Sequence, residues 1–117
     1  MPRVLIVDDA QFMRLRCARL SEQGYEVTEA QNGREAVEIY EKLRPDVVLM
    51  DITMPEMDGL TALRQIKQMD PGARVAMLTA LGQQGVVLEA VKAGARDFIV
   101  KPFEAERVLA AIQRLLS

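Results

Sequence analysis

Five polar residues of this sequence stand at or just after the ends of short apolar runs, and their types suit one chemistry. They are Asp8, Asp9, Asp51, Thr79 and Lys101. A carboxylate can be the nucleophile in phosphoryl transfer, a hydroxyl can hydrogen-bond a phosphoryl oxygen, and an ammonium can neutralise one. Three carboxylates brought close together cannot all stay ionised cheaply, so we expect a divalent cation among them. Magnesium suits a small oxygen-only site that retains waters, whereas calcium needs more oxygen ligands.

Each of these residues also has a simpler role when it is considered alone. Asp9 could cap the helix that follows the first strand, and Asp51 could begin a polar turn. Thr79 could be a turn or cap residue, and Phe98, at the start of a strand, could be plain core. Convergence of the polar groups at one place is what favours a chemical site. The elements that carry them therefore decide the question.

Apolar patterning predicts five strands that alternate with helices. Four runs are too short for helices and are rich in β-branched residues, which indicates buried strands: Val4–Val7, Val47–Met50, Val75–Leu78 and Phe98–Val100. The segment Glu26–Ala30 alternates polar and apolar residues, as an edge strand does. Three helices are predicted from apolar residues at i, i+4 and i+7 spacing, and two more from their length and position: Met13, Cys17 and Leu20; Ala36, Tyr40 and Leu43; Val108, Ile112 and Leu115; Leu60–Met69; and Gln83–Ala93.

This alternation predicts an α/β fold, with a doubly wound, five-stranded parallel sheet and five helices on both faces. Short right-handed crossovers and an exposed second strand favour the strand order 2-1-3-4-5. The first and third strands are then neighbours at the topological switch point, where a site is expected to open. The five strand ends would bring the polar residues to one edge of the sheet. We expect one domain over residues 1–117.

Composition excludes several classes of function. The chain has 50% apolar and 27% charged residues and a net charge of −2, without a basic stripe for nucleic acid. No apolar run approaches the roughly 20 residues of a membrane span, so we expect a cytoplasmic protein. Cys17 is the single cysteine, which excludes an internal disulfide and suits a packed core thiol. The absence of histidine excludes imidazole bases and nucleophile pairs that depend on them.

Four motifs occur in order along essentially the whole chain and resemble the receiver domains of two-component response regulators. They are VLIVDD at 4–9, MDITMPEMDGL at 50–60, LTA at 78–80 and KPF at 101–103. The strand order 2-1-3-4-5 is itself known from a chemotaxis regulator, so that prediction matches a known case and is not an independent derivation. The resemblance implies a flavodoxin-like receiver fold.

The resemblance also implies roles for individual residues. Asp51 corresponds to the phospho-acceptor, and Asp8 and Asp9 to the acid pair that binds Mg²⁺ together with it. Thr53 corresponds to the residue whose backbone carbonyl contacts the metal. These residues would form the metal site of the family.

Three further residues correspond to the family's catalytic and switch positions. Thr79 matches the switch hydroxyl that turns toward the phosphoryl group, Lys101 the ammonium that pairs with it, and Phe98 the aromatic residue whose rotamer follows the switch. A receiver is a signalling switch that catalyses its own phosphorylation and autodephosphorylation, and no other enzymatic turnover is expected.

The partners implied are a phosphoryl donor and an output protein. Because the chain has no histidine, a histidine kinase must act in trans or a small acyl phosphate must replace it as the donor. Output is expected at the surface formed by the helix at 83–93, the strand at 98–100 and the last helix, and we expect a monomer without nucleic acid or membrane partners. The stretches MDITMPEMDGLTAL, TALGQQ and AGARDFIVKPF resemble stand-alone chemotaxis regulators, which bind a flagellar motor switch protein.

Two alternatives compete with this hypothesis, and the order and spacing of the residues exclude the second. The chain could be a stand-alone receiver of another phosphorelay, or a fragment of a multidomain regulator, although no effector domain follows Leu116 and Ser117. A phosphatase of the haloacid dehalogenase type uses a similar set of residues around magnesium. In that family the nucleophile ends the first strand and a second Asp follows two positions later, whereas here the acid pair comes first and Thr53 stands two positions after Asp51.

Overall fold

A computed structural model describes residues 2–8, 20–52, 58–80, 84–101 and 104–117. Its strands are β1 (Arg3–Val7), β2 (Glu26–Ala30), β3 (Val47–Asp51), β4 (Val75–Thr79) and β5 (Asp97–Val100). Its helices in these ranges are α2 (Gly33–Leu43), α3 (Gly59–Met69), α4 (Gln84–Ala93) and α5 (Ala105–Leu116). Most of the first predicted helix, including Met13 and Cys17, falls in 9–19 and lies outside the described residues.

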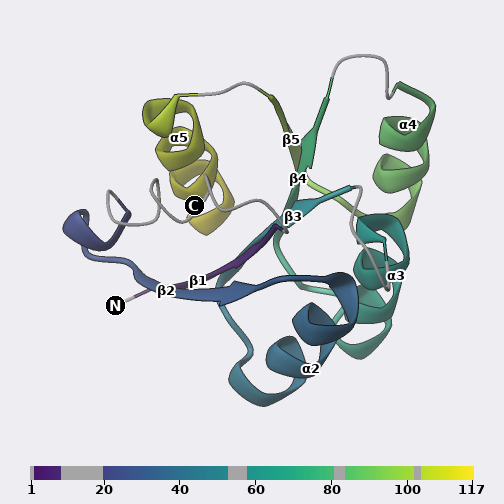
Figure 1. Cartoon of the computed structure of the whole chain (residues 1–117), viewed down its shortest axis with the longest axis horizontal. Helices are drawn as coiled ribbons and strands as arrows, with labels where there is room; N and C mark the ends of the chain where they lie inside the picture. The colour runs from purple at the N-terminus through teal and green to yellow at the C-terminus, as the bar shows by residue number, and fades with distance from the viewer. Residues whose placement is uncertain (1, 9–19, 53–57, 81–83, 102–103) are drawn as a thin grey trace.

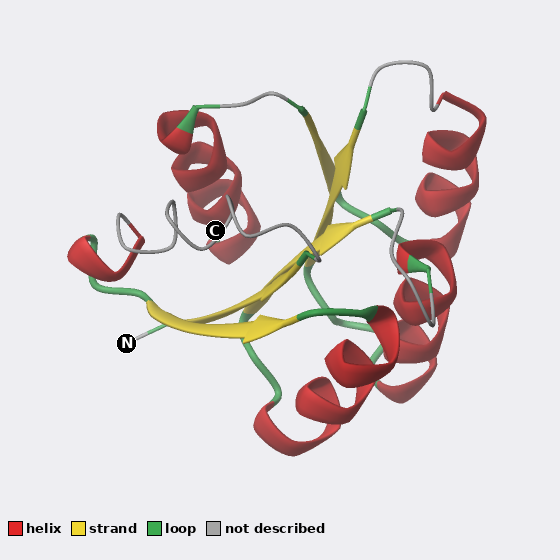
Figure 2. Ribbon diagram, in the orientation of Figure 1, coloured by secondary structure: helices red, strands yellow, loops and turns green. Residues whose placement is uncertain are grey.

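The strands form one parallel sheet in the order β2-β1-β3-β4-β5, which confirms the predicted topology. The predicted edge strand, β2, lies at one edge and pairs with β1 alone. Figures 1 and 2 show α2, α3 and α4 on one face of the sheet and α5 on the other. The architecture is therefore the doubly wound one that the alternation of elements predicts.

Two layers of core hold the helices on the sheet. Alternate residues of β3 point to opposite faces, so Val48 and Met50 join the core beneath α2, α3 and α4, while Val47 and Leu49 join the core beneath α5. All five residues of β3 and all five of β4 are buried. Strands covered on both faces read as continuous apolar runs, which is why these two were recognisable from sequence.

Local signals set the bounds of the helices. The Asn32 side chain caps α2 by accepting a hydrogen bond from the Glu35 amide at 2.8 Å, and Asp58 caps α3 in the same way through the Thr61 amide. Gly94 follows α4 with a φ of +107°, a conformation that favours glycine. No helix within the described ranges is long and apolar enough to cross a membrane.

Candidate functional site

Four of the predicted site residues meet at the carboxyl edge of the sheet. Asp51 ends β3 and Thr79 ends β4, while Asp8 and Lys101 directly follow β1 and β5. Parallel strands end at a common edge, and β1, β3 and β4 are successive neighbours, so residues far apart in sequence converge. Asp8 and Asp51 are 8% and 7% exposed and Thr79 is buried. The structure confirms that these residues converge.

The Lys101 ammonium joins the two acids. Its Nζ donates to Asp51 Oδ2 at 2.6 Å and lies 3.6 Å from Asp8 Oδ2. The Lys101 amide also donates to the carbonyl oxygen of Thr79 at 2.7 Å, which ties the end of β5 to the end of β4. Nearly buried carboxylates are costly unless they are paired. Lys101, directly after the end of β5, supplies that pairing.

Thr79 ends β4, and Phe98 is the second residue of the neighbouring strand β5. Thr79 Oγ1 donates to the carbonyl oxygen of Ala80 at 3.2 Å. Phe98 pairs in register with Met77 of β4 and is half-buried against the core beneath α2, α3 and α4. The structure thus places a buried hydroxyl and a partly exposed aromatic ring on the two strands that follow Asp51 across the sheet.

The donor set of the acidic site is suited to a hard divalent cation. Asp8 and Asp51 offer carboxylate oxygens, and one ammonium offsets one of their two negative charges. Oxygen-only ligands of this kind suit magnesium. The other two predicted ligands, Asp9 and Thr53, lie outside the described residues, and the described ones contain no group of three or more acidic, Cys or His side chains placed to hold a metal.

Gly59, in the motif that follows Asp51, supports the site through a close approach of its backbone. It begins α3, and its amide donates to the carbonyl oxygen of Ile52 at 2.8 Å. A Cβ atom built on Gly59 would overlap the carbonyl oxygen of Asp51 and come within 2.9 Å of its carbonyl carbon. Glycine therefore lets the start of α3 approach the backbone of Asp51. A glycine at the first position of a helical pattern was the available signal.

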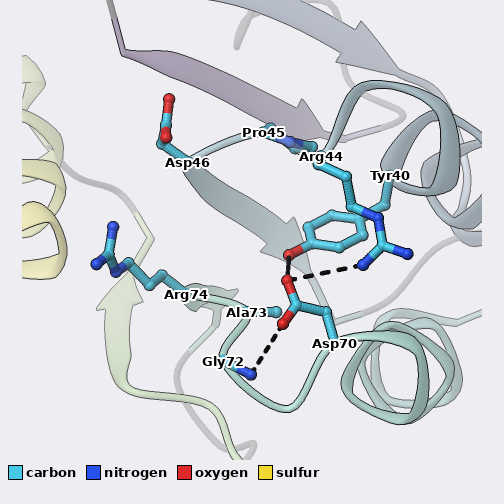
Figure 3. Close-up of a pocket in the computed structure, with 8 residues that line it drawn as sticks. All are labelled: Tyr40, Arg44, Pro45, Asp46, Asp70, Gly72, Ala73 and Arg74. Carbon is cyan, nitrogen blue, oxygen red and sulfur yellow. Dashed lines mark hydrogen bonds and ion pairs between the residues drawn. The ribbon is translucent and has the colours of Figure 1, made fainter.

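A second polar cluster is made by Tyr40, Arg44 and Asp70 (Figure 3). It lies near the starts of β3 and β4, away from the strand ends that carry Asp51 and Thr79. The Tyr40 hydroxyl donates to Asp70 Oδ2 at 2.7 Å, and an Arg44 nitrogen lies 3.8 Å from the same oxygen. Burial, followed by the hydrogen bond to Asp70, raises the pKa of Tyr40, and that bond is the largest cause of a lowered pKa of Asp70. The cluster borders a cavity of about 200 Å³ and joins the ends of α2 and α3.

Comparison with known proteins finds one family along nearly the whole chain. The family model described as the response regulator receiver domain matches residues 4–113. The chain is 58% identical to the chemotaxis protein CheY of Bacillus subtilis over 117 residues, covering 98% of each chain. It is 56% identical to CheY of Thermotoga maritima over 115 residues, covering 97% of this chain and 96% of the other.

Solved structures are similar to this one over nearly its whole length. The receiver domain of NtrX from Brucella abortus has a TM-score of 0.89 at 34% identity and 97% coverage of both chains. The CheX–CheY–BeF₃–Mg²⁺ complex from Borrelia burgdorferi has a TM-score of 0.90 at 38% identity, covering 99% of this chain and 90% of the other. With its family model, its relatives and its sheet-edge site in agreement, this chain belongs to the response regulator receiver domain family.

Proposed function

We propose that the chain is a phosphorylation-controlled signalling switch, in which Asp51 accepts a phosphoryl group from a phosphohistidine of a separate kinase. The observation that carries this proposal is the nearly buried Asp51 carboxylate with the Lys101 ammonium at 2.6 Å and the Asp8 carboxylate beside it. A nucleophile and a cation that neutralises phosphoryl oxygens are the groups that phosphoryl transfer needs. The donor is a second protein because this chain contains no histidine.

In the proposed reaction, a carboxylate oxygen of Asp51 attacks the phosphorus in line with the nitrogen of the phosphohistidine. A P–O bond forms and the P–N bond breaks; its electron pair stays on the imidazole, which takes one proton from water and leaves neutral. The product is an aspartyl phosphate. Lys101 is placed to donate hydrogen bonds to the phosphoryl oxygens. The chain catalyses this step and the later hydrolysis on itself alone.

Asp8 and Asp51, with Asp9 and the backbone carbonyl of Thr53, are the residues proposed to hold Mg²⁺. When it is bound, this ion supplies positive charge against the phosphoryl oxygens and offsets the repulsion between the acids. Asp8 and Lys101 contribute on either side of Asp51, the first as a ligand and the second as a fixed cation. The two roles are separate, because the ammonium cannot coordinate a metal.

Phosphorylation is proposed to switch the protein through Thr79 and Phe98. The Thr79 hydroxyl would exchange its bond to Ala80 for one to a phosphoryl oxygen, and Phe98 would move into the space this leaves. These movements shift an existing equilibrium at the surface of α4, β5 and α5. Large apolar side chains stand exposed on two of these elements, as docking surfaces do: Leu88, Val91 and Val100.

We propose a flagellar motor switch protein as the output partner, and the similarity of the chain to proteins named as chemotaxis proteins supports this proposal. We expect an immobilised motor switch peptide to capture the chain strongly when beryllofluoride, a phosphoryl mimic, and magnesium are present and weakly when they are absent. Asp51→Asn should remove the dependence on beryllofluoride.

A matched pair of surface variants locates the contact. Leu88→Ser on α4 should weaken the beryllofluoride-dependent capture, whereas Leu43→Ser, which changes an exposed leucine at the end of α2, should leave it unchanged. Equal capture with and without beryllofluoride would contradict the proposed switching of this partner.

A further inference from the structure

Arg107 joins the first turn of α5 to the main chain of the strand that carries Phe98. Its Nη2 donates to the carbonyl oxygen of Phe98 at 2.8 Å and lies 3.4 Å from Asp97 Oδ1. The contact is to backbone and to a neighbouring carboxylate, so it follows the position of β5 whatever rotamer the Phe98 ring adopts. No motif or spacing in the sequence predicted this contact.

Asp97 is built into the same link. Its Oδ1 accepts the Phe98 amide at 2.8 Å, and its Oδ2 lies 3.7 Å from an Arg114 nitrogen two turns further along α5. The Asp97 side chain is 11% exposed, so its negative charge is poorly solvated and would be destabilising without a cationic partner. The Asp97 side chain is therefore fixed to β5 by the backbone amide of Phe98 and to α5 by two arginines.

The other end of β5 leads to the acidic site. Lys101 directly follows this four-residue strand and contacts both Asp51 and Asp8. One short strand thus has its far end at the carboxylates and its first two residues tied to α5. A shift of β5 caused at Lys101 or Phe98 must either carry Arg107 with it or break a 2.8 Å hydrogen bond.

We propose that Arg107 is a positioning residue that transmits the state of the acidic site to α5 through the backbone of Phe98. This inference rests on the proposed function, because it needs Asp51 to be the group that is modified. Arg114 lies 3.7 Å from the carboxylate of Asp97 on the same helix, whereas Arg107 also donates to the Phe98 backbone, so Arg114 serves as the matched control. Loss of either arginine removes one positive charge.

The test is amide hydrogen exchange of the whole chain, with and without beryllofluoride and magnesium. In the unmodified chain, α5 peptides should change their exchange rate by about fivefold or more, the lower range of allosteric couplings. Arg107→Met keeps the aliphatic stem that packs on the helix surface and removes the donor. In this variant peptides around Asp51 should still respond, while the response of α5 is lost.

Two more variants separate transmission from simple stabilisation. Arg107→Lys, which retains a charged donor, should restore the α5 response, and Arg114→Ala should keep it. An unchanged α5 response in Arg107→Met, or an equal loss in Arg114→Ala, would overturn the inference alone. No response at Asp51 in the unmodified chain would instead refute the proposed function, and this inference with it.

Discussion

At the scale of single residues, Lys101 explains how Asp8 and Asp51 can lie together at a nearly buried sheet edge. Its ammonium contacts both carboxylates, at 3.6 and 2.6 Å, so neither acid faces the other without a cation between them. Two carboxylates that share one ammonium in a poorly solvated site repel each other strongly when that ammonium is absent. The same ammonium lies where phosphoryl oxygens on Asp51 would gather. One residue therefore stabilises the resting site and suits the proposed chemistry.

Gly59 gives a residue-scale prediction, because its Cα lies against the backbone of Asp51. Gly59→Ala should lower the free energy of unfolding by about 1–3 kcal/mol, the usual cost of overpacking, since the added methyl overlaps the Asp51 carbonyl oxygen. It should also slow labelling of Asp51 by acetyl phosphate, because backbone must shift to make room. Urea unfolding and intact-mass time courses measure the two effects.

Gly85→Ala is the matched control for that substitution. Gly85 lies in the first turn of α4 with open space where its Cβ would stand, so alanine there should raise stability by up to about 1 kcal/mol. Its rate of labelling should equal that of the unmodified chain. A Gly59→Ala protein as stable and as quickly labelled as Gly85→Ala would show that the contact with Asp51 has no consequence.

Sequence reasoning predicted which residues meet at the site but not how they contact one another. Asp51 and Thr79 were predictable because each follows a continuous apolar run, and the ends of parallel strands share one edge. The 2.6 Å contact of Lys101 and the overlap that a Cβ on Gly59 would make depend on how the loops and helices are placed in space, which residue spacing alone does not give. Asp9 and Thr53 stay predictions.

At the scale of elements, the cluster of Tyr40, Arg44 and Asp70 joins α2 to α3. Tyr40 lies in the last turn of α2, and its hydroxyl donates to Asp70, the residue directly after α3. Asp70 also accepts the Gly72 amide at 3.0 Å, which holds the turn that leads into β4. The Arg44 guanidinium lies 5.6 Å from the centre of the Tyr40 ring. These contacts fasten the two helices at the edge of the sheet away from Asp51.

Tyr40→Phe should lower the free energy of unfolding at pH 7 by about 1 kcal/mol, the value of one hydrogen bond partly exposed to water. That corresponds to a fall in Tm of about 4 °C. The hydrogen bond lowers the pKa of Asp70, so its contribution is present above the ordinary carboxyl range and is lost as the pH falls through the lowered value. Urea unfolding at pH 7 and pH 3 should therefore show a smaller difference at pH 3.

The same variant has a second pH signature at the alkaline end. The pKa of Tyr40 is raised in the folded chain, so the contribution of its neutral hydroxyl is present below the ordinary tyrosine pKa and is lost as the pH rises past it. Tyr25→Phe is the control, since the Tyr25 hydroxyl makes no hydrogen bond to another described residue. Equal effects of the two substitutions at every pH would contradict the account.

The bounds of an element were predictable where the pattern of apolar residues and the polar or turn residues at its ends agreed. The segment Glu26–Ala30 has the bounds of β2 in the structure. Its apolar residues point to opposite faces: Val27 packs on the core beneath α5, and Ala30 joins the core beneath α2, α3 and α4. The predicted strand Val47–Met50 ended one residue before the end of β3, because Asp51 is a polar residue of the kind usually found in turns. The capping roles of Asn32 and Asp58 were not predicted; in the structure their side chains accept hydrogen bonds from amides in the first turns of α2 and α3.

At the scale of the whole molecule, the parallel sheet separates two kinds of polar cluster. The carboxyl edge carries Asp8, Asp51 and Lys101, and the ends of α2 and α3 at the other edge carry the cluster around Tyr40. The order β2-β1-β3-β4-β5 places β1 beside β3 at the point where the order reverses, which brings Asp8 to Asp51. The topology thus places the proposed phosphorylation site at the carboxyl ends of the strands and the cluster that joins α2 to α3 at their amino ends.

The identity of the phosphorylated residue is the central claim, and chemical mapping tests it directly. The chain is labelled with acetyl phosphate and magnesium, reduced with borohydride, which converts an aspartyl phosphate to homoserine, and sequenced by tandem mass spectrometry. We predict one phosphoryl group per chain, a single reduced residue at position 51, and no labelling of Asp51→Asn. Reduction at Asp8 or Asp9 instead, or unchanged labelling of Asp51→Asn, would contradict the account.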